Sequence, residues 1–145
     1  MPKVMILNGP NLNLLGTRQT EIYGAATLDD ILRDMADLAH EHGLDTEARQ
    51  SNHEGDLVDW IQEARADCAA IIINAGAYSH TSIAILDALN AFDGLVVEVH
   101  VSNIHAREPF RHHSHISARA DGFVSGLGPE GYMAAVRYLV ARLSA

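Results

Sequence analysis

A glutamate and a histidine stand two positions apart in a short apolar run, at Glu98 and His100. If that run is a β-strand, both side chains project from the same face, because successive strand residues point to opposite faces. A carboxylate beside an imidazole fixes the orientation of the ring and stabilises its charged form. The spacing therefore makes His100 a candidate general acid and Glu98 the group that orients it.

A candidate base lies elsewhere, in the stretch between residues 14 and 26. This stretch is long for a strand-to-helix connection and carries Arg18 and Tyr23 between Gly16 and Gly24, which fits a mobile lid with a reactive group. A phenol has an ordinary pKa of about 10, and nearby guanidinium groups lower it by favouring the phenolate. Tyr23 is therefore a candidate base, although an exposed tyrosine and arginine in a loop also occur without a catalytic role.

Two other patterns suggest ligands, but their context does not support them. Four histidines crowd the segment after His100, without an accompanying cysteine and without a recognisable zinc spacing. They are His105, His112, His113 and His115. The segment from Gly126 to Gly131 matches the dinucleotide string G-x-G-x-x-G, but the sequence ends at residue 145, so we expect no following strand of a nucleotide-binding unit. Pro129 at a helix start explains this segment without a cofactor, and we expect neither metal nor nucleotide.

Polar side chains follow, or stand at the end of, four separate short runs that could form strands. These polar stretches are 8–13, 51–55, 74–80 and 98–103. If the runs are parallel strands, their carboxyl ends share one edge of a sheet and the side chains converge there. Amides and imidazoles near arginine suit a hydroxylated anion of small size, because arginine pairs with carboxylate or phosphate. A single asparagine at such a place is more simply a turn former, but four strand ends together indicate a binding site.

The elements that must position these residues alternate along the chain. Short β-branched runs are separated by longer stretches of helical period, the pattern of parallel strands joined by crossover helices. The predicted strands are Val4 to Asn8, Asp45 to Gln50, Ala69 to Asn74, Leu95 to His100 and Phe123 to Ser125. The first predicted helix begins after Thr27. The other predicted helices cover Asp56 to Ala64, Ser82 to Asn90 and Pro129 to Leu143. We expect a flavodoxin-like α/β fold, a five-stranded parallel sheet of order 2-1-3-4-5 with helices on both faces.

One predicted helix has almost no polar face. Nearly every residue from Ile83 to Leu89 is apolar, and Asp87 is the only charged one among them. Such a helix is buried on all sides. The sheet of a small domain covers one side of it, so we expect another subunit to cover the other side and Asp87 to lie at that contact.

Size and charge narrow the function classes. At 145 residues, 48% of them hydrophobic, the chain fits a single domain over residues 1–145 that folds on its own. A net charge of −9 disfavours nucleic acids and anionic membranes as partners, because these are bound by clustered lysine and arginine. Cys68 is the only cysteine, and there is no charged-then-apolar leader, so we expect a cytoplasmic protein.

Taken together and in order, these segments resemble the type II 3-dehydroquinate dehydratases. The resemblance rests on 7–16 with Arg18 and Tyr23, and on 50–55, 74–82, 98–103, 107–111 and 122–132, and so covers essentially the whole chain. It implies conversion of 3-dehydroquinate to 3-dehydroshikimate in the shikimate pathway, by anti elimination through an enolate, without metal or cofactor. It also implies a homododecamer built from trimers, which agrees with the apolar helix.

The resemblance assigns the removal of the proton to one group of residues. Tyr23, as a phenolate, takes the proton beside the ketone, while Arg18 and Arg107 lower its pKa. Asn11 positions a water that stabilises the enolate oxygen. The sequence departs from the family at residues 19–20, where Gln-Thr replaces a pair that commonly ends in proline, and this difference bears on lid closure.

The resemblance assigns the departure of the hydroxyl to His100, which Glu98 orients. The remaining residues bind the substrate. Its carboxylate is held by Asn74, Ser102 and the backbone of Val101, its ring hydroxyls by His80 and Arg111, and Asp87 reaches it from a neighbouring subunit.

Other classes of protein share the predicted fold. A receiver domain needs an acidic pair after the first strand and a lysine after a late strand, whereas this chain has Asn8 and Asn11 there and Lys3 as its only lysine. A flavin-binding or phosphate-binding protein is the main alternative, and a flavin would colour the purified protein. A binding module without catalysis is the remaining interpretation if Tyr23 is inert. An imine mechanism is excluded by position, because Lys3 precedes the first strand and lies at the opposite edge of the sheet.

Overall fold

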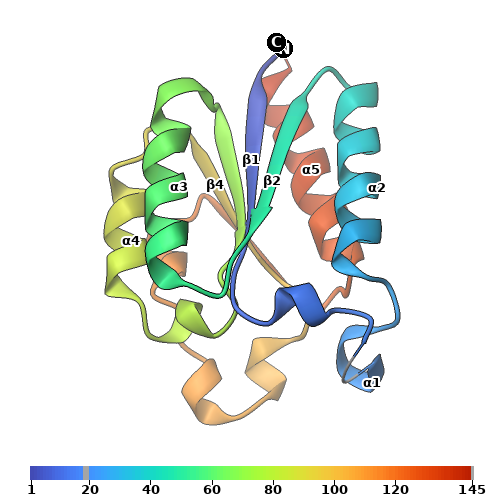
Figure 1. Ribbon diagram of the computed structural model, residues 1–145, viewed down its shortest axis with the longest axis vertical. Coiled ribbons are helices and arrows are strands. Elements are labelled where there is room, and N and C mark those ends of the chain that lie inside the picture. Colours follow the sequence, from blue (N-terminus) through green and yellow to red (C-terminus); the bar gives the residue numbers. More distant parts are fainter. Residues whose placement is uncertain (18–19, 145) are drawn as a thin grey trace.

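A parallel sheet of five strands runs through the structure, a computed structural model that describes residues 1–17 and 20–144 (Figure 1). The strands are β1 (Lys3–Asn8), β2 (Asp45–Gln50), β3 (Ala70–Asn74), β4 (Leu95–His100) and β5 (Gly122–Ser125). Their order is β2-β1-β3-β4-β5, with every neighbouring pair parallel. The predicted flavodoxin-like order is confirmed, and each predicted strand agrees with the observed one to within one residue at either end.

Helices cover both faces of the sheet in the described part of the chain (Figure 1). The longer ones are α2 (Leu28–Glu41), α3 (Glu54–Asp67), α4 (Ile83–Asn90) and α5 (Glu130–Leu143). α2 packs beside α5 on one face, and α3 packs beside α4 on the other. Each face has its own apolar core, which contains Ile6 and Met35 on the first side and Leu7 and Ile61 on the second. Within the described residues, no helix is long and apolar enough to cross a membrane.

The start of α2 is fixed by a capping box. The Thr27 hydroxyl accepts a hydrogen bond from the Asp30 backbone N–H at 3.1 Å, and the Asp30 carboxylate accepts one from the Thr27 backbone N–H at 3.2 Å. Gly43 follows the helix with a φ of 83°, a left-handed conformation that favours glycine and ends the helix. The segment between residues 14 and 26 therefore runs into a helix whose first turn is held in place.

The carboxyl ends of the strands lie at one edge of the sheet, opposite the start of β1 and the end of α5 (Figure 1). Asn8 ends β1 and pairs in register with Gln50 on one side and Asn74 on the other. His100 and Ser125 end β4 and β5 and are also paired in register. The predicted convergence of polar residues at this edge is confirmed.

A buried chain of hydrogen bonds joins α5 to this edge. Tyr132 is fully buried, donates to Asn8 Oδ1 at 2.6 Å and accepts from Asn74 Nδ2 at 2.9 Å. Asn74 Oδ1 accepts a hydrogen bond from the backbone N–H of Gly76 at 3.1 Å. Burial raises the pKa of Tyr132, so its phenol stays protonated and can keep donating. One side chain of α5 therefore fixes the last residues of both β1 and β3.

The substitution Tyr132→Phe tests this connection. We expect it to lower the free energy of unfolding by about 1–3 kcal/mol, because it leaves two buried amide side chains without their partner. Urea unfolding at one fixed protein concentration measures the change. Tyr138→Phe, on the same helix, is the control, because that hydroxyl contacts Arg142 at the surface and its loss should cost less than about 0.5 kcal/mol. Equal losses in the two variants would contradict the role of Tyr132.

Candidate active site

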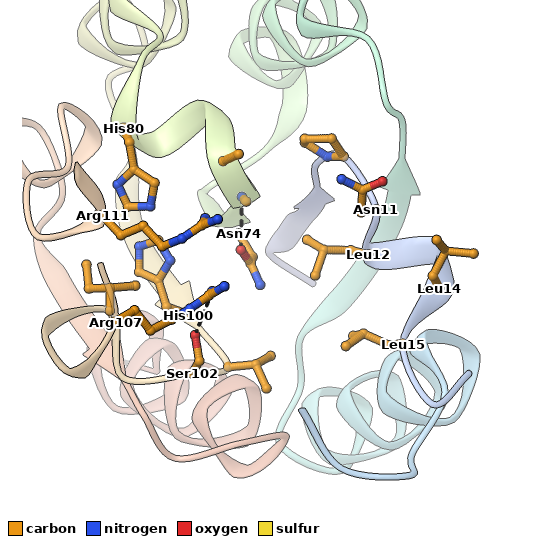
Figure 2. A pocket seen from close by; sticks show the side chains of 15 residues that line it. Asn11, Leu12, Leu14, Leu15, Asn74, His80, His100, Ser102, Arg107 and Arg111 are labelled. Carbon is orange, nitrogen blue, oxygen red and sulfur yellow. Dashed lines mark hydrogen bonds between the residues drawn. The ribbon is translucent and has the colours of Figure 1, made fainter. Parts of the chain in front are cut away.

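A cavity of about 150 Å³ opens at the carboxyl edge of the sheet, among the turns that follow β1, β3 and β4 (Figure 2). Eight residues singled out in the sequence line it together. They are Asn11, Asn74, His80, His100, Val101, Ser102, Arg107 and Arg111. Figure 2 shows the histidines, the arginines and Ser102 on one side and Asn11, Leu12, Leu14 and Leu15 on the other. The structure thus brings together most of the residues that the sequence placed at a binding site.

His100 and Glu98 form a buried pair at the floor of this site. His100 Nε2 lies 2.5 Å from Glu98 Oε2, and Glu98 is 0% exposed. Burial by itself would raise the pKa of Glu98, but hydrogen bonds from His100, Ser114 and Ser117, together with the His100 charge, lower it below its ordinary value. Glu98 is therefore ionised and accepts the Nε2–H hydrogen bond. The second ring nitrogen, Nδ1, is left free of this bond and can exchange a proton.

A second imidazole, that of His80, is stacked against the first. The ring centroids of His80 and His100 are 6.2 Å apart, and their planes differ by 18°. His80 Nδ1 lies 2.8 Å from the backbone carbonyl oxygen of His113, so this nitrogen carries hydrogen and donates. Burial, together with the charges of His100 and Arg111, lowers the pKa of His80. His80 is therefore neutral at neutral pH, and its Nε2 can accept a hydrogen bond from a hydroxyl group.

The arginines give the cavity a positive character. Arg107 Nη1 donates to Ser102 Oγ at 3.4 Å. Arg111 is the last residue of the short helix Pro109–Arg111, and its Nε donates to Glu108 Oε2 at 2.8 Å. None of the described residues lining the cavity is acidic. Glu108 pairs with both arginines from outside the lining, so the cavity wall itself presents two guanidinium groups and no carboxylate, which suits an anionic ligand.

The asparagine side of the cavity is held by the turns after β1 and β3. Asn74 uses its oxygen for Gly76 and one amide hydrogen for Tyr132, so its second amide hydrogen remains to donate to a ligand. Asn11 has a left-handed φ of 69°, and its backbone N–H donates to Asn52 Oδ1 at 3.0 Å. A Cβ atom on Gly9 would lie 2.5 Å from the carbonyl oxygen of Ala75. Only glycine therefore allows these two turns to approach each other so closely.

The glycine-rich segment 126–131 supports the site from behind. Gly126 N–H donates to the carbonyl oxygen of His100 at 3.2 Å, and Gly128 N–H donates to that of Val101 at 3.0 Å. Both glycines have positive φ, of 89° and 61°. The segment therefore anchors the backbone of the residues that end β4, a role that accounts for its glycines without a nucleotide.

Of the residues predicted for the site, Glu98 lies beneath His100 and outside the cavity lining, and three others have no described place in that lining. Arg18 lies outside the described residues. Tyr23 ends the short helix α1 (Thr20–Tyr23), of which the structure describes the backbone at that position. Asp87 is exposed on α4 and does not line the cavity of its own chain. The roles given to these three residues stay predictions.

The sequence alone did not identify some of the residues that support the site. Ser114 and Ser117 bind Glu98 although they lie 16 and 19 positions away in a segment without periodicity. Tyr132 reaches Asn8 across 124 positions, and only its place near the start of an apolar helix hinted at burial. In residues 1–17 and 20–144 no cluster of three histidine, cysteine or acidic side chains is arranged to hold a metal ion.

Comparisons with known proteins agree with this geometry. Residues 2–140 match the family described as Dehydroquinase class II. A 3-dehydroquinate dehydratase of Streptomyces coelicolor is 63% identical over 139 residues, 95% of this chain and 88% of that protein. A 3-dehydroquinate dehydratase 2 of Agrobacterium fabrum is 59% identical over 135 residues, 93% of this chain and 92% of that protein.

Solved structures show the same relationship. The crystal structure of type II dehydroquinase from Propionibacterium acnes matches this fold with a TM-score of 0.94 and 44% identity, covering 97% of both chains. That from Butyrivibrio crossotus matches with a TM-score of 0.93 and 40% identity, over 95% of this chain and 97% of the other. Family match, sequence identity and fold agree over nearly the whole length, and the chain belongs to the type II dehydroquinase family.

Proposed function

We propose that the cavity binds 3-dehydroquinate and that the protein dehydrates it to 3-dehydroshikimate, a step of the shikimate pathway. The observation that carries this proposal is the pairing of a cationic, hydrogen-bonding cavity with the buried Glu98 and His100 pair on its floor. 3-Dehydroquinate is a hydroxylated carboxylate with a hydroxyl group β to a ketone, so it needs an anion site and an acid at the leaving oxygen. The names of the relatives support this substrate.

The substrate-binding roles follow from the donors that the cavity offers. The free amide hydrogen of Asn74, the Ser102 hydroxyl and the backbone of Val101 take the carboxylate. Arg111 donates to a ring hydroxyl, and the Nε2 atom of the neutral His80 accepts from another. A ligand held at both ends in this way presents its leaving hydroxyl toward His100.

His100 acts as the general acid from Nδ1. Its Nε2–H stays bonded to Glu98, so the ionised carboxylate stabilises the imidazolium until the leaving hydroxyl takes the Nδ1 proton. The hydroxyl then departs as water. Asn11 positions a water that stabilises the negative enolate oxygen.

Tyr23 acts as the base. Among the four tyrosines, Tyr132 is a buried phenol with a raised pKa, and Tyr78 donates its hydroxyl to the Asn52 carbonyl oxygen at 2.8 Å. Tyr138 contacts Arg142 on α5. Tyr23 lies in the segment whose earlier residues line the cavity, where Arg18 and Arg107 would favour its phenolate.

Tyr23→Phe tests the base. We expect turnover to fall by about 10²–10⁴-fold, because the variant lacks only the phenolic oxygen that removes the proton. The absorbance of the conjugated enone product measures turnover, and Tyr138→Phe is the control that should keep normal activity. Activity of Tyr23→Phe within tenfold of the unaltered protein would remove Tyr23 from this role.

The alternative mechanism passes through an imine between a lysine and the ketone. Lys3 is the only lysine, and its Nζ lies 2.8 Å from Asp67 and 3.2 Å from Glu47 at the amino end of β1. Hydrogen bonds from Nζ to Asp67 and Glu47 raise the pKa of Lys3, so its amine is protonated and not nucleophilic. Lys3 thus faces the edge of the sheet opposite the cavity, in a state that does not attack ketones.

Borohydride treatment separates the two mechanisms. With 3-dehydroquinate present, we expect borohydride neither to inactivate the protein nor to add substrate mass to it, since no imine forms. Intact-mass spectrometry and the enone assay measure both outcomes, and Lys3→Ala should remain active. A substrate-sized adduct on Lys3 with loss of activity would refute the enolate mechanism.

The exposed side of α4 supports an assembly of several subunits, which we take to be the homododecamer that the resemblance implies. In the single chain Ile85 and Leu89 of α4 are buried against the sheet, whereas Ile83 is 51% exposed and Asp87 is exposed beside it. A second subunit on this side would cover the apolar surface and bring Asp87 toward a neighbouring cavity.

The cytoplasmic location inferred from the single cysteine also stays a prediction.

Asp87→Ala tests the contact. We expect the protein to elute at several times the mass of one chain, and Asp87→Ala to raise the KM for 3-dehydroquinate while the variant remains folded. Light scattering and steady-state kinetics measure these two properties. Asp29→Ala, an exposed acid on α2 at the other face, should change neither. A fully active monomer would contradict the assembly.

A further inference from the structure

Two serines from the connection between β4 and β5 hold the buried carboxylate of Glu98. Ser114 Oγ donates to Glu98 Oε2 at 2.6 Å, and Ser117 Oγ donates to Oε1 at 2.5 Å. Oε2 also accepts the hydrogen bond from His100 Nε2. Both carboxylate oxygens are therefore bonded, and Ser114 shares one oxygen with the imidazole.

This arrangement suits an ionised carboxylate. An ionised carboxylate only accepts hydrogen bonds, and all three partners of Glu98 can donate. Burying a charge without such partners is so costly that the group normally takes up a proton instead. The two hydroxyl groups therefore offset the loss of water around Glu98 and contribute to its lowered pKa.

The backbone that carries the serines is anchored independently of Glu98. His115 N–H donates to the carbonyl oxygen of Ser79 at 2.9 Å. Ile116 is 0% exposed and packs into the core on the α3 and α4 side of the sheet. Ser114 and Ser117 flank these two anchors, so their hydroxyl groups are presented to Glu98 from a fixed segment.

We propose that Ser114 and Ser117 are positioning residues that keep Glu98 ionised and aimed at His100 Nε2, so that the proton used in catalysis is held at Nδ1. The catalytic part of this inference rests on the proposed function, because the proton is used in that reaction. The charge of Glu98 is independent of that function, because it is a property of the folded protein alone.

The sign of the effect follows from the loss of a donor. Removing either hydroxyl group takes a hydrogen bond from the charged form of Glu98, so the pKa of Glu98 rises. The active form of the enzyme needs an ionised Glu98, so activity falls at low pH as Glu98 takes up a proton. The acid limb of the pH profile follows this protonation, which belongs to the coupled pair of Glu98 and His100. That limb should therefore move to higher pH when a serine is replaced by alanine.

Other titratable or charged groups face the same pair from neighbouring elements. His80 is stacked on His100, and Arg107 and Arg111 line the cavity above it. These three residues are unchanged in the serine variants and affect every pH profile alike. The difference between a variant and the unaltered protein therefore isolates the contribution of the serine.

The experiment compares pH profiles of kcat for Ser114→Ala, Ser117→Ala and the double variant. We expect kcat at neutral pH to fall by about 10- to 100-fold in the double variant. Activity falls by a similar factor in metalloenzymes when a hydrogen-bond partner of a metal-ligating side chain is removed. The acid limb should move up by at least about 0.5 pH unit. KM should stay within about threefold, because neither serine lines the cavity.

Two further variants separate positioning from folding. Ser117→Thr keeps a hydroxyl group at an exposed position and should restore the profile and most of kcat. Ser82→Ala removes a buried serine that caps α4 by accepting from the Ile85 backbone N–H at 2.9 Å. Ser82→Ala should lower the melting temperature and leave the acid limb in place.

A second measurement does not depend on turnover. In protein labelled with ¹³C at the glutamate carboxyl carbons, the Glu98 signal, assigned with Glu98→Gln, should titrate at higher pH in each alanine variant. An unchanged titration and an unchanged kcat profile in both single variants would overturn the proposal, whether or not the double variant folds. A protein without dehydratase activity but with the expected Glu98 shift would refute the proposed function and retain the role of the serines in holding the charge.

Discussion

The five strands all run in the same direction, and most other features of the molecule depend on that constraint. A parallel strand must be followed by a crossover, so each chain segment leaves the sheet at the carboxyl edge and returns at the other edge. Residues far apart in the sequence, such as Asn8, Asn74 and His100, therefore meet at one edge without any local signal that connects them. The helices on both faces exclude water from the sheet, which leaves this edge as the place where polar groups can act.

Burial at that edge sets a second requirement, which the side chains must meet. Glu98 and Tyr132 are both 0% exposed, and burying either side chain without hydrogen-bond partners would cost free energy of folding. Tyr132 is kept as a neutral donor between two asparagines, whereas Glu98 is kept as an anion among three donors. The same depth of burial thus yields opposite charge states, because the partners of each group differ in kind.

The sequence predicted β1, β3, β4 and β5 closely because each contains a short apolar or β-branched run, and it also predicted β2, whose residues are mostly polar and at least partly exposed. The helix predicted over 56–64 is longer in the structure, Glu54–Asp67, because the added residues are polar or small and mostly exposed, and so add nothing to the apolar period. Cavity residues were predictable where they end a strand, as Asn74 does, or stand within two residues of its end, as Ser102 does. Ser114 and Tyr132 were not, because their roles depend on contacts made only after the chain has folded.

The proposed reaction also explains why the cavity and its floor carry opposite charges. It needs the phenolate of Tyr23 and the imidazolium of His100 in one molecule at the same time. Phenols ordinarily lose their proton near pH 10 and imidazolium ions near pH 6.5, so the reversed arrangement costs about 5 kcal/mol without help. Arginines line the cavity in which the proposed base would act, whereas the ionised Glu98 beneath it accepts the Nε2–H hydrogen bond of His100, so the base and the acid have separate partners. The acid and the base must then lie on different segments, because a single cluster of charges would favour one of the two forms at the expense of the other.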